Sequence, residues 1–87
     1  MKTIHRHRRS TRLLRWVFRR GAHIVTTQLD REGQQAAYTL SLVPHWDVGQ
    51  AVVQTFDAAV TAFRRHAALA DELRRQGWTL ASYTLER

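Results

Sequence analysis

The chain has 87 residues, 44% of them hydrophobic, and its 14 basic and seven acidic side chains give it a net charge of +7. This length and composition indicate a single folded domain with a small core, and they exclude a chain that is disordered throughout. The absence of cysteine excludes disulfides, a thiolate zinc site and a cysteine nucleophile, and it favours a cytoplasmic location. No apolar run approaches the roughly 20 residues that span a bilayer.

The positive charge is confined to the first third of the chain. Residues 1–29 contain eight basic and no acidic side chains, whereas residues 30–87 contain six basic and seven acidic ones, so the two parts carry +8 and −1. We expect residues 1–11 to form a flexible basic arm ahead of a single α+β domain at 12–87. A localised positive field attracts polyanions, and arginine suits phosphate contacts, although a GC-rich genome would also favour arginine codons.

Residues 14–19 alternate in the manner of a β-strand. The apolar side chains fall on one face and the basic ones on the other: Leu14, Trp16 and Phe18 against Arg15 and Arg19. Gly21 then indicates a tight turn, because glycine readily adopts a positive φ. A helix over residues 11–20, as in a membrane-surface segment or a transit peptide, is the alternative. The β-rich segment that follows favours a hairpin.

Two further strands are expected at residues 22–30 and 35–43, which are rich in β-branched or alternating apolar residues. The polar cluster at 30–33 between them is a turn signal. Connections as short as these make neighbouring strands antiparallel, so the three strands form a meander. After a loop at Pro44, a fourth short strand is expected at 51–56.

The segment that follows Asp57 has the periodicity of an amphipathic helix. Its apolar stripe consists of Val60, Phe63, Ala67, Ala70 and Leu73. Asp57 is the expected N-cap, and Gly77 occupies the position where glycine commonly ends a helix. A final strand is expected at 78–85. The predicted fold class is therefore α+β, with an antiparallel meander of three to four strands, one long helix packed on the sheet and a C-terminal strand.

Side chains with catalytic or metal-binding chemistry are scattered along the chain. His5 and His7 lie among arginines that would repel a cation, and His45 and Asp47 have no nucleophile near them in the sequence. His66, beside the apolar stripe of the helix, is expected to be a boundary residue with one hydrogen bond. We therefore expect no catalytic residue, no metal, no cofactor and no enzymatic activity.

The candidate binding residues are the arginines of the arm and the first hairpin, which would contact the phosphates of nucleic acid without reading its sequence. They are Arg6, Arg8, Arg9, Arg12, Arg15, Arg19 and Arg20. A solvated charged surface is the alternative interpretation of the same residues. Trp46, beside a proline in a polar loop, either covers the edge of the core or projects toward a partner. The alternative function is a protein-interaction or homodimerisation module, completed through an exposed sheet edge or face.

The order of elements resembles two families of known domains. Three or four antiparallel strands followed by a helix resemble the single-stranded-nucleic-acid-binding modules of the PUR kind. Aromatic residues before, inside and after the helix (Phe56, Phe63 and Trp78) also resemble the WGR domain. The Trp-Gly-Arg run that names this domain is absent, and a shared order of elements does not establish function, so no site residue is carried over from either family.

Overall fold

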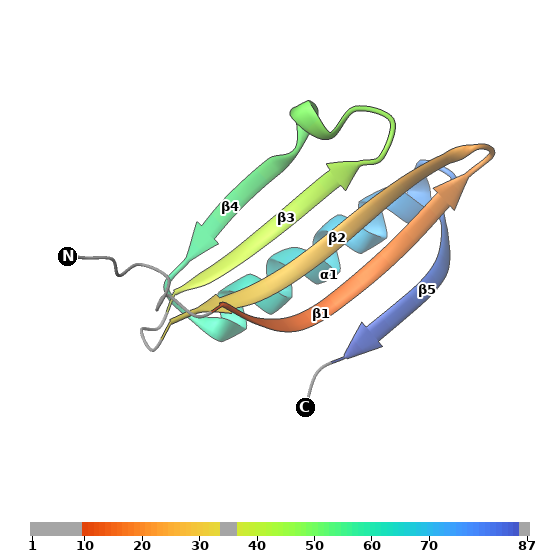
Figure 1. Ribbon diagram of the computed structural model, residues 1–87. Coiled ribbons are helices and arrows are strands. Elements are labelled where there is room, and N and C mark those ends of the chain that lie inside the picture. Colours follow the sequence, from red (N-terminus) through yellow and green to blue (C-terminus); the bar gives the residue numbers. More distant parts are fainter. Residues whose placement is uncertain (1–9, 34–36, 86–87) are drawn as a thin grey trace.

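The computed structural model describes residues 10–33 and 37–85 of the chain. This part of the chain forms five strands, one short 3-10 turn and one long helix (Figure 1). In chain order they are β1 (Ser10–Arg20), β2 (His23–Glu32), β3 (Tyr38–Pro44), η2 (Val48–Gln50), β4 (Val52–Phe56), α1 (Ala59–Arg75) and β5 (Thr79–Leu85). The predicted α+β class is confirmed, with four strands in the meander and a fifth after the helix. β1 begins at Ser10, inside the stretch expected to be an arm.

The five strands form one antiparallel sheet in the order β4-β3-β2-β1-β5. The meander supplies the first four strands, each hydrogen-bonded to the one before it. α1 then carries the chain across one face of the sheet, from the β4 edge to the opposite edge, where β5 pairs with β1. In the view of Figure 1 the helix lies behind the sheet, and no described element covers the face turned toward the viewer. We call this uncovered surface the open face.

The core lies between the sheet and the helix. Alternate side chains of β1, β2 and β3 point toward α1, as the predicted alternation of β1 requires. The buried apolar residues of the three strands are Leu14, Phe18, Val25, Leu29 and Leu40. The helix contributes mainly small residues, including Ala62 and Ala70, which let its backbone lie close to the sheet. Phe18 and Leu29 are fully buried and belong to two adjoining clusters of the core.

The helix ends in a hydrogen-bonded cap at Gly77, as predicted. Gly77 has a φ of 95°, a backbone conformation that residues with a Cβ rarely adopt. Its N–H donates to the carbonyl of Arg74 at 3.0 Å, and the N–H of Trp78 donates to the carbonyl of Leu73 at the same distance. The two bonds satisfy carbonyls that the helix itself leaves unpaired, and the Leu73 and Trp78 side chains pack in one core cluster.

The predicted N-cap is wrong by one position. The residue before the helix is Ala58, whose backbone is extended with φ −143° and ψ 137° and whose side chain cannot cap. Asp57 lies one residue too early, because β4 runs to Phe56 and the chain needs both following residues to turn into the helix. The start of α1 is therefore determined by the end of the strand before it rather than by a capping side chain.

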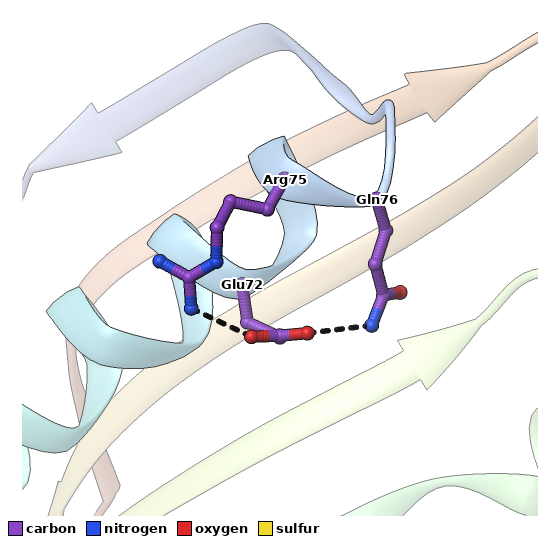
Figure 2. A network of polar contacts seen from close by, with 3 residues as sticks. All are labelled: Glu72, Arg75 and Gln76. Atoms are coloured by element: carbon purple, nitrogen blue, oxygen red, sulfur yellow. Dashed lines mark hydrogen bonds and ion pairs between the residues drawn. The ribbon is translucent and has the colours of Figure 1, made fainter.

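An exposed polar network holds the last turn of the helix (Figure 2). Arg75 and Gln76 donate hydrogen bonds to the two carboxylate oxygens of Glu72, at 2.7 and 2.9 Å. These bonds lower the pKa of Glu72 below its usual range. The carbonyl of Gln76 also accepts a hydrogen bond from Arg20 Nη1 at 2.8 Å, so the helix end is tied to the end of β1.

Candidate nucleic-acid interface

Three of the predicted arginines, Arg12, Arg15 and Arg19, lie exposed on the open face of β1, and we call them the arginine row. Arg15 and Arg19 alternate with the core residues of the same strand. They stand opposite Gln28 and Ile24 of β2. With a rise of about 3.3 Å per residue, the Cα atoms of Arg15 and Arg19 are about 13 Å apart. The row therefore offers positive charge along one line of an otherwise uncovered sheet.

A β-bulge brings Arg12 into the row. The register with β2 shifts between Arg12 and Leu14, so that Leu13 is an extra residue in β1. In a regular strand Arg12 and Arg15, three positions apart, would point to opposite faces. The extra residue restores Arg12 to the open face, where it stands opposite Asp30. Sequence alternation alone places only Arg15 and Arg19 together, because a bulge depends on the partner strand.

The electrostatic environment differs along the row. In the part of the chain that the structure describes, the side chains of Arg15 and Arg19 have neither a hydrogen-bond nor an ion-pair partner. Arg12 lies near two acidic residues, Asp30 and Glu32. Burial raises the pKa of Asp30, against the lowering effects of a hydrogen bond from Gln28 and of the Arg12 charge. The positive charge that is available to an anion is therefore concentrated at Arg15 and Arg19.

Hydroxyl groups flank the row on the neighbouring edge strand. Thr84 stands opposite Arg15 and Thr79 opposite Arg19, and both threonines are exposed. Hydroxyls of this kind commonly donate to phosphate oxygens. None of the eight aromatic side chains, all of which are described, lies on the open face, since those of the strands point toward the helix and the others lie in α1 or at the end of the sheet. The open face is thus suited to phosphates and not to stacked bases.

Arg20 is separated from the row and is engaged within the fold. Its guanidinium lies over the Trp78 ring, 4.7 Å from the ring centre, and donates to the Gln76 carbonyl. These contacts are on the helix side of the sheet. A shallow hollow of about 420 Å³ lies between the row and Arg20 where β1 ends, without an acidic side chain in its wall. The hollow is lined by Arg19, Arg20, Gly21, Gly77, Thr79 and Ala81.

The other predicted site residues have different positions. Trp46 stacks on Trp78 with ring centres 6.1 Å apart and planes at 10°, and the His23 ring meets its edge at 4.7 Å. Trp46 stays 55% exposed, so it covers the edge of the core and keeps a surface toward solvent. Arg6, Arg8 and Arg9 lie outside the described residues.

His66 is more deeply buried than the predicted boundary residue. It is 3% exposed, shares a 2.8 Å hydrogen bond between its Nε2 and Thr27 Oγ1, and packs edge-on against Trp16. The distance to Thr27 is that of a base and a hydroxyl nucleophile. Thr27, however, is fully buried, so no substrate reaches its hydroxyl. The pair is therefore part of the core, and it connects the helix to the middle of the sheet.

Burial of His66 predicts a pH-dependent stability. Burial lowers the pKa of His66 in the folded protein below its value in the unfolded chain, about 6.5. The contribution of His66 is complete above that value and is lost as the pH falls toward the lower folded pKa, because the unfolded chain binds the proton first. We expect the unfolding free energy, measured in urea, to decrease between pH 7 and pH 5. His66→Gln should weaken this decrease, whereas Thr61→Gln, an exposed substitution on the same helix that involves no titrating group, should leave it unchanged. An equal slope in all three proteins would contradict the assignment.

Comparison with protein-family models, with curated proteins and with solved structures finds no match to this chain. Within residues 10–33 and 37–85, no three His, Asp or Glu side chains gather closely enough to hold a metal ion. No helix of that part of the chain is long and apolar enough to cross a membrane. The open face of the sheet is therefore the feature from which a function can be inferred.

Proposed function

We propose that this protein binds nucleic acid through the phosphate backbone, with the arginine row as its contact surface. The main support for this proposal is that Arg15 and Arg19 are exposed on one sheet face and have no carboxylate partner among the described residues. A guanidinium in this state can form bidentate, charge-assisted hydrogen bonds with a phosphate. On this proposal the domain is a binding protein rather than an enzyme, and it needs no cofactor.

The shape of the surface supports a linear polyanion as the ligand. The row follows β1, which has one neighbour on each side in the sheet (Figure 1). The exposed threonines of β5 extend the polar surface beside it. Because these contacts are made with phosphates and not with base edges, we expect weak sequence preference.

The direct test is fluorescence anisotropy with labelled single-stranded DNA, duplex DNA and RNA at low and physiological salt. Wild-type protein should bind at low salt, and the affinity should fall as salt is added. Arg15→Ala/Arg19→Ala should weaken binding by roughly a hundredfold or more, because each of the two lost charge-assisted contacts is worth about 1.5–3 kcal/mol.

Arg64→Ala/Arg75→Ala is the matched control, since it removes the same charge from the exposed surface of α1. This variant should retain most of the affinity. Equal losses in the two double variants would show that only net charge matters. A wild-type protein that binds none of the three polymers at low salt would overturn the proposal.

A further inference from the structure

The outer edge of β4 is open for pairing with another strand. β4 is hydrogen-bonded to β3 on one side, and no described strand lies on the other. Natural proteins protect such edges with charges, prolines or bulges, because unpaired backbone groups attract further strands. Residues 48–56 contain no charged residue and no proline, and the pairing of β4 with β3 is regular over its whole length. This edge therefore lacks the usual protection.

The opposite edge of the sheet is different. The register between β5 and β1 is irregular near Val17 and Phe18, and such an irregularity disrupts the ladder and increases the local twist. Both edge strands expose large side chains: Val52 and Val53 of β4 are 56% and 59% exposed, and Tyr83 of β5 is 61% exposed. β4 also borders a groove of about 200 Å³ between the sheet and α1. Its walls are Leu40, Leu42, Val52, Gln54, Arg65 and Leu69.

We propose that β4 pairs antiparallel with β4 of a second copy of this chain, about a two-fold axis at Gln54. In this register Val52 stands opposite Phe56 of the second copy, Val53 stands opposite Thr55, and Gln54 faces itself. Each pair is uncharged, and β-branched residues opposite aromatic ones stabilise antiparallel strands. Val52 and Phe56 lie on the helix side of the sheet, next to the apolar groove. The sequence of β4 is thus complementary to itself.

The charge of the protein is compatible with this pairing. Each chain carries +7, but the arginine row lies on β1, three strands from β4. In the dimer the two rows would be separated by seven strand spacings, or about 34 Å, which is several times the screening length at physiological salt. The two open faces remain uncovered, so dimerisation and nucleic-acid binding do not compete. Five paired residues make a small interface, and we expect a dissociation constant of roughly 1–100 µM.

A charge-swap experiment tests both the edge and the register. Gln54→Lys places two positive charges opposite each other at the axis, and Gln54→Glu places two negative charges there. Gln54→Lys should raise the dissociation constant of the dimer roughly tenfold in sedimentation velocity, because like charges directly opposite destabilise strand pairs. Gln54→Glu should raise it by a smaller factor, because the Arg65 guanidinium that donates to Gln54 would offset part of the negative charge. An equimolar mixture of the two should restore a dimer, now a heterodimer with lysine opposite glutamate.

Ala68→Lys on the exposed surface of α1 is the charge-matched control and should dimerise like the wild type. Circular dichroism checks that each variant is folded; Gln54→Glu keeps an oxygen that can accept the present 3.2 Å hydrogen bond from Arg65. Wild-type protein that stays monomeric up to about 500 µM would overturn the proposal. A dimer that is insensitive to both Gln54 substitutions, or a mixture that fails to re-form it, would overturn this interface. Neither outcome affects the proposed phosphate contacts.

Discussion

Phe18→Ala is expected to lower the unfolding free energy by about 3–5 kcal/mol, the usual cost of removing a buried phenylalanine side chain. Phe18 is fully buried and packs in one cluster with Val25, Leu73 and Trp78, so it joins β1, β2 and the end of the helix. Domains of this kind have a total stability of roughly 5–15 kcal/mol, with small ones at the lower end. The variant should therefore retain little of its stability and be partly unfolded at physiological temperature.

Urea unfolding followed by tryptophan fluorescence measures this effect. The matched control is Val17→Ala, which changes the preceding residue of the same strand; Val17 lies on the open face and is only half-buried. We expect the control to cost about 1 kcal/mol or less. If the two substitutions had equal effects, the assignment of the core to the helix side of β1 would be wrong.

The salt dependence of nucleic-acid binding should decrease in steps as the arginine row is removed. For duplex DNA, the slope of log K against log salt concentration is about −0.9 for each phosphate that is neutralised. Removing Arg15 should make the slope shallower by about 0.9, and removing Arg15 and Arg19 together by about 1.8. We expect a smaller change for Arg12→Ala, because the acidic residues near Arg12 already compensate part of its charge.

Arg20→Ala provides a stringent control for the slope. It removes an arginine from the same hairpin, but this guanidinium lies over Trp78 on the other side of the sheet. The slope should therefore stay close to that of the wild type, while stability decreases as the contacts to Trp78 and Gln76 are lost. A change in slope equal to that of Arg19→Ala would place the binding surface around the whole hairpin and not on the open face.

Only the Arg12 end of the arginine row depends on the bulge at Leu13. β1 presents Arg15 and Arg19 to one face through ordinary alternation, whereas Arg12 reaches that face only because one residue is left over in the pairing with β2. The bulge lies at the end of the row where Asp30 and Glu32 are found. Nucleic acid should therefore be held more tightly at the Arg19 end, where Ile24 and Thr79, and no carboxylate, stand opposite the arginine.

The sequence by itself determined two local features of this protein, the buried face of β1 and the end of the helix. The alternation of Trp16 and Phe18 with Arg15 and Arg19 predicts which face of β1 is buried, because successive side chains of a strand point to opposite faces. The end of the helix at Gly77 follows from a backbone conformation that favours glycine. Both inferences need only neighbouring residues, and the structure confirms both.

The tertiary structure alone decided how distant segments are combined. The face of Arg12 depends on the register between two strands, and the engagement of Arg20 depends on Gln76, which is 56 positions further along the chain. The placement of β5 beside β1, and therefore of its threonines beside the arginine row, follows from the path of the helix across the sheet. The same path leaves β4 as an open edge. Local periodicity cannot contain this information, because strand order and register are set by the pairing and packing of residues that are far apart in the sequence.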